Sequence, residues 1–287
     1  MDGWTLALAL LPESLQTQAE AMEPGAEEIR LRRGRVPTLL ADGRETAFSD
    51  SLVSGEDMSR VLEKATGASM HTVSSALREG YLSWRGLRIG VCGSVIPEAR
   101  GAVYQAISSL AIRIPREYPG LSRRLMAQLY PLEFRSTLII SPPGAGKTTI
   151  LRDLIRALAD SGHRVSVVDE RNELSASQDG QAQFDLGAQT DLLIGLDKAR
   201  AAMLLLRAMN PQIIAMDEIS TPGDIEAVEQ IFGCGVGILA TAHAANRDEL
   251  CRRPLYRRLL DGGGFCHLIT IEQAGSRRSY RAERLDA

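Results

Sequence analysis

The residues with the clearest chemistry are 141–149, which read Ser-Pro-Pro-Gly-Ala-Gly-Lys-Thr-Thr. An apolar strand pattern ends just before them at Ile140, and a helical pattern begins near Lys147. Glycines allow backbone N–H groups to approach phosphate oxygens, and the start of a helix adds a partial positive charge. The order of strand, loop and helix therefore predicts a phosphate-binding P-loop of the Walker A type.

The side chains of this loop have separate expected roles. Lys147 is expected to reach the β- and γ-phosphates of ATP and to act in catalysis, and the Thr148 hydroxyl to ligate Mg²⁺. Ser141 stands where the usual pattern has its first glycine, and we treat it as a tolerated variant because serine can also form a turn. Only three of the 33 basic residues are lysines, which argues against a chance match. The predicted ATP-binding residues are Ser141, Pro142, Pro143, Gly144, Ala145, Gly146, Lys147, Thr148 and Thr149.

A pair of carboxylates ends a second apolar strand pattern, Gln-Ile-Ile-Ala-Met-Asp-Glu at residues 212–218. Asp217 is expected to hold Mg²⁺, and Glu218 to orient or activate the attacking water in catalysis. Side chains alternate along a strand, so only a turn after Asp217 can bring both carboxylates to the phosphates. The alternative interpretation is that the two acids at this strand end are simply solvated.

Two further strand patterns end in polar residues. Thr241 and His243 close one of them and are expected to sense the γ-phosphate, with His243 taking part in catalysis. The alternative for His243 is an ordinary surface histidine. Asp169 and Glu170 close the other, at the sheet edge where α/β folds bind ligands. We expect both carboxylates near the nucleotide or the water shell of its metal, with a structural salt-bridge cluster as the alternative.

The second half of the chain has the pattern of a three-layer α/β domain with a mostly parallel sheet. Its strand patterns are almost continuously apolar, as in strands covered by helices on both faces, and helical patterns separate them. We expect strands at Thr137–Ile140, Val165–Val168, Gln212–Met216, Val236–Ala240 and His267–Ile271.

The first half has the pattern of a smaller α/β domain with an antiparallel sheet. Pro119 and Gly120 mark the boundary, so the expected domains are residues 1–118 and 119–287. In the first domain we expect a helix from Trp4 to about Ala21 broken near Pro12, a hairpin around Gly34, a helix from Ser54 to Gly67, a short helix at Thr72–Arg78, a hairpin turning at Arg85-Gly86, and a strand at Ile107–Ile114.

The composition is that of a globular protein. The 287 residues are 44% hydrophobic with a net charge of −3, which excludes disordered and fibrous classes and gives no indication of a polyanionic partner. The first apolar run, Leu6–Leu11, is too short to span a bilayer and follows no positive charge, so we expect neither a signal peptide nor membrane insertion. The four cysteines lack metal-ligand spacing, and we expect reduced thiols packed as small hydrophobic side chains in the cytoplasm.

Four of these segments together resemble the stage III sporulation protein AA family. They are residues 141–149, Val-Val-Asp-Glu-Arg at 167–171, Met-Asp-Glu-Ile at 216–219 and Thr-Ala-His-Ala at 241–244. Members of that family are similar to the ATPases of type II and type IV secretion systems. The likeness covers about residues 28–272, although Gln189 stands where an arginine is expected.

This resemblance implies a RecA-like ATPase core behind a separate N-terminal domain, with ATP and Mg²⁺ as ligands. It implies a ring-shaped homo-oligomer, a hexamer, docked on membrane proteins at the mother-cell side of the channel that joins mother cell and forespore. Asp169 and Glu170 would correspond to the acidic box of the secretion ATPases, and Thr241 and His243 to their histidine box. On this basis we expect an ATP hydrolase that powers assembly of that channel or transport through it.

Two other function classes fit parts of the sequence. A nucleic-acid-dependent P-loop ATPase of the RecA or helicase type would use the arginine clusters at 252–258 and 30–35. Single-strand binders add aromatic platforms, and aromatic residues are only 5% here, so we expect solvated or subunit-contact faces instead. A nucleotide-binding scaffold without hydrolysis is disfavoured by the complete set of catalytic residue types. The arginine that would act in trans stays open among Arg113, Arg116, Arg171 and Arg207.

Overall fold

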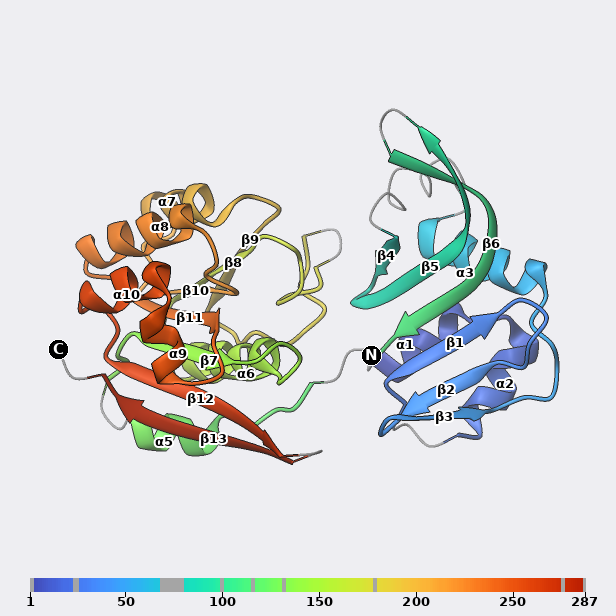
Figure 1. Ribbon diagram of the computed structural model, residues 1–287, viewed down its shortest axis with the longest axis horizontal. Helices are drawn as coiled ribbons and strands as arrows, with labels where there is room; N and C mark the ends of the chain where they lie inside the picture. Colours follow the sequence, from blue (N-terminus) through green and yellow to red (C-terminus); the bar gives the residue numbers. More distant parts are fainter. Residues whose placement is uncertain are drawn as a thin grey trace. The chain divides into compact units, whose positions relative to one another are not determined.

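The computed structural model describes residues 3–22, 26–67, 80–98, 101–114, 117–130, 133–177, 180–274 and 277–285. The chain divides into two compact units, Met1–Arg116 with Ala176–Gln183 and Glu117–Ser175 with Phe184–Ala287. The helix expected at 72–78 lies outside the described residues. Each unit has its own sheet, and the two are described separately (Figure 1).

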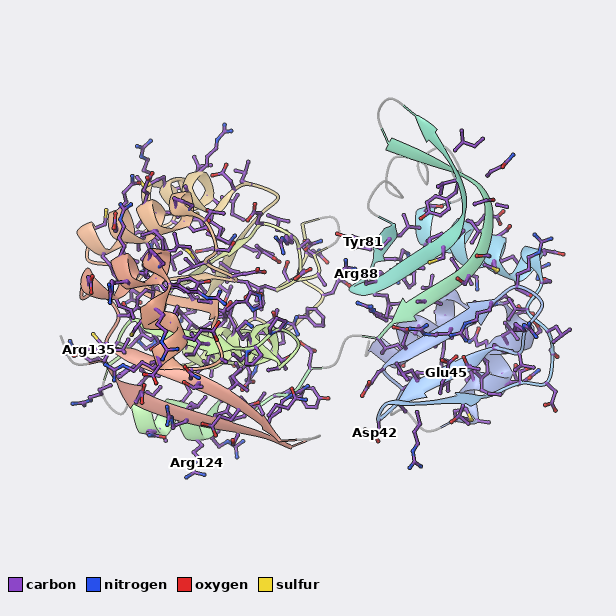
Figure 2. The ribbon with its side chains drawn as sticks, in the orientation of Figure 1. Asp42, Glu45, Tyr81, Arg88, Arg124 and Arg135 are labelled. Carbon is purple, nitrogen blue, oxygen red and sulfur yellow. The ribbon has the colours of Figure 1, made fainter. Side chains whose placement is uncertain are left out.

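The sheet of the first unit has six strands in the order β3-β2-β1-β6-β5-β4. All of its pairings are antiparallel, as the sequence predicts. Arg85 and Gly86 both have positive φ, at 45° and 86°, and form the expected turn between β4 and β5. Close to that turn, the Arg88 guanidinium lies 3.8 Å over the ring of Tyr81 (Figure 2). The strands are β1 Glu28–Arg32, β2 Thr38–Ala41, β3 Arg44–Ala47, β4 Tyr81–Trp84, β5 Leu87–Glu98 and β6 Gly101–Arg113.

Three helices of the first unit are described: α1 Gly3–Leu10, α2 Glu13–Glu20 and α3 Gly55–Thr66. The break between α1 and α2 falls at Pro12, as expected from its ring geometry. Ser54 and Asp57 form a capping box at the start of α3, and Gly67 with φ 69° ends that helix. The core of this unit is apolar and includes Leu10, Ile29, Leu31, Leu62 and Ile112.

The sheet of the second unit has seven strands in the order β13-β12-β7-β11-β10-β8-β9. Every pairing is parallel except that of β12 with β13, which confirms the mostly parallel sheet. Because β7, β8, β10 and β11 run in one direction, their carboxyl ends meet at one edge, where ligands bind in such folds. The strands are β7 Thr137–Ser141, β8 Val165–Asp169, β9 Thr190–Ile194, β10 Ile213–Met216, β11 Gly237–His243, β12 His267–Ala274 and β13 Arg277–Arg284.

Helices cover both faces of this sheet. One apolar cluster joins the sheet to α5 and α6, and a second joins it to helices α7 to α10, which gives three layers. The six helices among the described residues of this unit are α5 Arg123–Leu129, α6 Lys147–Asp160, α7 Lys198–Ala208, α8 Pro222–Gly233, α9 Arg247–Arg252 and α10 Pro254–Asp261.

Three details differ from the sequence expectations. Strands β9 and β13 were not predicted, because both lie at sheet edges where the pattern is not continuously apolar. In the hairpin around Gly34, the alternating pattern predicts Val36 on the same face as Ile29 and Leu31. Val36 is instead half-buried in the turn, and Leu39 occupies the inward position on β2. The four cysteines are free, but Cys92 and Cys234 are exposed and the other two are half-buried, so they do not pack as core hydrophobes.

Candidate active site

The P-loop connects the buried strand β7 to the first turn of α6. Gly144 and Gly146 have φ of 76° and 101°, a left-handed conformation that glycine adopts without strain. Ser141, at the position of the usual first glycine, lies inside β7 and needs no such conformation, so serine fits there. Pro142 to Gly146 form the loop itself, and Lys147 to Thr149 begin the helix. The expected context of strand, loop and helix is therefore present.

The Lys147 side chain is buried within this loop. Its Nζ donates hydrogen bonds to the carbonyl oxygens of Ser141 at 3.0 Å and Pro142 at 3.2 Å, and it lies 2.9 Å from His243 Nδ1. Burial lowers the pKa of Lys147, while the nearby carboxylates of Asp217 and Glu218 oppose that shift. These contacts fix the ammonium group between the loop and the end of β11.

The Asp217 carboxylate joins three elements. Thr148 Oγ1, at the start of α6, donates to Asp217 Oδ2 at 2.8 Å, and Thr241 Oγ1 of β11 donates to Asp217 Oδ1. The two residues expected to hold a metal thus touch one another. A hydroxyl and a carboxylate are hard oxygen donors of the kind that Mg²⁺ prefers, so the residues fit that ion.

The next residue, Glu218, turns sharply out of the strand. Its φ of 51° lies in the left-handed region, which is uncommon for a residue with a side chain and concentrates at functional sites. This turn places both carboxylates at the same sheet edge, as the alternation argument required. Glu218 Oε1 lies 3.3 Å from His243 Nε2, and Glu218 Oε2 lies 3.4 Å from Arg171 Nη1.

His243 connects Lys147 to Glu218 through its two ring nitrogens. The ammonium of Lys147 can only donate, so Nδ1 of His243 must accept. In the neutral ring the proton then sits on Nε2 and faces the Glu218 carboxylate. The imidazole is therefore oriented from both sides.

The acidic segment at the end of β8 begins with a buried carboxylate. Asp169 is only 3% exposed, and its oxygens accept hydrogen bonds from the backbone N–H groups of Glu173, Leu174 and Ser175 at 2.8 to 3.1 Å. Both oxygens accept hydrogen bonds within their own loop, and Asp169 also lines the cavity that Glu170, Asp217 and Glu218 line. The carboxylate thus fixes the shape of the segment that follows β8.

The next carboxylate, Glu170, pairs with a buried lysine. Its Oε2 is 2.7 Å from the Nζ of Lys198, which is 8% exposed and also lies 3.8 Å from Asp224 Oδ1. Glu170, Lys198, Asp217 and Glu218 line one cavity. Sequence reasoning did not assign Lys198 to this region, although the scarcity of lysine was a signal that could have singled it out.

Comparison with known proteins places this geometry in a family. The family model described as "Sporulation stage III, protein AA" matches residues 8–281. The stage III sporulation protein AA of Bacillus subtilis (strain 168) is 32% identical over 277 residues, which cover 92% of this chain and 90% of that protein.

Two solved structures resemble the fold. The ATPase DotB of Legionella pneumophila matches with a TM-score of 0.63 and 16% identity, over 91% of this chain and 77% of that one. The pilus retraction motor PilT with bound ADP matches with a TM-score of 0.61 and 17% identity, over 94% and 82%. These likenesses show the fold, a RecA-like α/β domain preceded by a smaller α/β domain, which confirms the expected fold class.

In the part of the chain that the structure describes, no helix is both long enough and apolar enough to cross a bilayer. The family match spans both units and nearly the whole length of the chain. The residues that suggested the resemblance in the sequence are those that meet at the carboxyl edge of the parallel sheet. The chain belongs to the stage III sporulation protein AA family.

Proposed function

We propose that this chain is a Mg²⁺-dependent ATP hydrolase of the secretion type that acts in sporulation. The observation that carries the proposal is the contact network of Lys147, Thr148, Asp217, Glu218 and His243 at one edge of the parallel sheet. A phosphate loop, a pair of oxygen donors for a metal and a carboxylate oriented by a histidine are the parts that phosphoryl transfer to water needs.

In this proposal the loop N–H groups and Lys147 bind the β- and γ-phosphates of ATP. Thr148 and Asp217 would hold Mg²⁺, which would offset negative charge on the phosphate oxygens. Glu218 orients the attacking water and accepts its proton. His243 keeps Glu218 in place through Nε2–H, while Nδ1 contacts the lysine that binds phosphate.

Strand β11 is suited to report hydrolysis. Thr241 bonds to Asp217 and to the backbone of Glu218, and His243, two residues later, bonds to Lys147. A change in phosphate charge would reach this strand through three separate contacts. Thr241 and His243 thus serve as sensors of the γ-phosphate in the proposal.

The proposed assembly is a homo-oligomeric ring, a hexamer, at the mother-cell side of the membranes around the forespore. There it docks on membrane proteins of a channel complex and powers assembly of that channel or transport through it. Family membership and the secretion-ATPase fold support this part. Of the arginines that could act in trans, Arg171 pairs with Glu218 in cis, Arg113 pairs with Glu28, and Arg207 is exposed on α7. Arg116 lies outside the described residues.

The ion pairs of the arginine clusters argue against the alternative of a nucleic-acid-dependent ATPase. Arg258 pairs with Glu229 at 2.6 Å, and Arg253 pairs with Glu249. In the first unit Arg32 pairs with Glu45, and the hydrogen bonds from Arg32 and Thr38 lower the pKa of Glu45 to about 2. These three arginines are already paired with carboxylates, which makes them poor candidates for phosphate contacts.

The test is ATP turnover by the purified protein, with and without Mg²⁺ and with and without single-stranded DNA. Lys147→Ala should abolish both ATP binding and hydrolysis, whereas Lys64→Gln, which removes a lysine charge on α3, should leave them unchanged. Undiminished turnover in Lys147→Ala would contradict the proposal. Turnover that requires DNA would favour the alternative.

A further inference from the structure

The hairpin β12–β13 places an arginine beside the P-loop. In the sheet order, β12 and β13 lie on the side of β7 opposite to β11. Arg278, Tyr280 and Ala282 share one face of β13 because side chains alternate along a strand. Tyr280 and Ala282 pack against the apolar cluster that contains the core residues of α6. Arg278 therefore projects toward the start of α6, where the phosphate loop ends.

The contact with the loop is direct. A Cβ atom added to Gly146 would lie 3.6 Å from each of Cζ, Nε and Nη1 of Arg278. Three guanidinium atoms at one distance mean that the planar group faces the glycine. Gly146 has φ 101° and caps α6, so this guanidinium lies against the residue from which the phosphate-binding helix starts.

Arg278 is available for an outside anion. Its side chain is exposed, and among the described residues it forms no ion pair with a carboxylate. Two other cations near the site are already paired with carboxylates, Arg171 with Glu218 and Lys198 with Glu170. Asp217 and Glu218 bring two negative charges to the site, and Lys147 brings one positive charge within the loop itself. A Mg–ATP complex carries net negative charge, so the site as a whole favours one more positive group.

The position of Arg278 indicates which part of the nucleotide it meets. Glu218 and His243 lie on the β10 and β11 side of the loop, and the proposed function puts the γ-phosphate there. Arg278 lies on the opposite flank. We propose that Arg278 binds the α-phosphate of the nucleotide in cis, as a second cation supplied by the C-terminal hairpin. This inference rests on the proposed function, because it assumes nucleotide in the loop.

The experiment measures binding of fluorescent mant-ADP and mant-ATP to the full-length protein. Arg278→Gln should weaken both by about tenfold, since both carry an α-phosphate and a charge-assisted hydrogen bond is lost. Arg278→Lys should retain most of the affinity because it keeps the charge. The matched control is Arg281→Gln, which removes the same charge from an exposed position on the opposite face of β13 and should bind like the wild type.

The outcomes separate the two claims. Wild-type affinity in Arg278→Gln would overturn the inference and leave the proposed function intact. Equal losses in Arg278→Lys and Arg278→Gln would also overturn it, because charge would then not be the property that matters. If the wild-type protein binds neither nucleotide, or Lys147→Ala binds as well as the wild type, the proposed function itself fails.

Discussion

The hydroxyl oxygen of Thr241 accepts a hydrogen bond from the backbone N–H of Glu218 at 2.8 Å. Glu218 lies beyond Met216, the last residue of β10 that pairs in the sheet, so its N–H needs a partner outside the β-ladder. The neighbouring strand β11 supplies that partner. The orientation of the proposed catalytic carboxylate therefore depends on a residue 23 positions further along the chain.

Thr241→Val tests this dependence. Valine has nearly the same shape but can neither accept from Glu218 nor donate to Asp217. A small displacement of a catalytic group costs about 100-fold in rate, so kcat should fall by about that factor in a steady-state ATPase assay. Thr241→Ser retains the hydroxyl and should recover most of the activity. A valine variant with wild-type kcat would show that this bond does not position Glu218.

Asp217→Asn and Glu218→Gln should affect different quantities. Asp217 touches the Thr148 hydroxyl, so its loss should weaken Mg–ATP binding itself. Glu218 acts on the attacking water, a contribution made mainly in the transition state, so Glu218→Gln should lower kcat by roughly 10²–10⁴-fold with ATP affinity nearly intact.

The measurement for this pair is Mg–ATP affinity beside single-turnover hydrolysis. Hydrolysis at the wild-type rate in Glu218→Gln would place the catalytic carboxylate elsewhere. Glu170 would then be the leading candidate, because it lines the same cavity as Asp217 and Glu218.

Oligomerisation should raise turnover. A subunit alone leaves the γ-phosphate open to water and without an arginine from a neighbour, so specific activity should increase with protein concentration as rings form. The check is ATPase activity across the range in which sedimentation velocity shows monomers becoming oligomers. Constant specific activity across that range would contradict a site completed in trans.

His267 should make stability depend on pH. It is 4% exposed, its Nδ1 has no hydrogen-bond partner in the described part of the chain, and burial, with Arg284 and Arg135 nearby, lowers its pKa. The unfolded chain therefore binds a proton on this ring more readily than the folded protein does. Stability that is present above the unfolded value of about 6.5 should be lost as the pH falls below it.

Urea unfolding at pH 7.5, 6.5 and 5.5 measures this dependence. His267→Phe keeps an aromatic ring beside Tyr130 but cannot bind a proton, so it should lose less stability on acidification than the wild type. His163→Phe, at a half-buried position after α6, serves as the control and should follow the wild type. Parallel losses in the wild type and His267→Phe would rule out His267 as the cause.

The sequence predicts those parts of the fold and site that local patterns encode. The loop from Ser141 to Thr149 has its glycines where left-handed conformations occur. Strands β7, β8, β10 and β11 are almost continuously apolar because helices cover both faces. Strand β13 carries four arginines in eight residues, so its pattern shows no apolar run. Its backbone joins the sheet by pairing with the free edge of β12.

Long-range partners are the other part that a single sequence does not reveal. Lys198 and Glu170 are 28 residues apart, and nothing in their local pattern indicates that they meet. The position of Asp169 at a strand end predicts that it lies at the ligand-binding edge, and it lines the cavity there. The backbone N–H groups that its oxygens accept from, four to six residues later, depend on the path of the loop and have no signal in the local pattern.

The backbone of Glu218 has a consequence for any screen that selects for thermostability. A side-chain-bearing residue held at φ 51° costs on the order of 1 kcal/mol or more, and Glu218→Gly or Glu218→Asn would relieve that strain. Selection for heat resistance alone would therefore enrich variants that have lost the carboxylate, whereas selection for turnover would retain it. Libraries built to stabilise this protein should keep position 218 fixed.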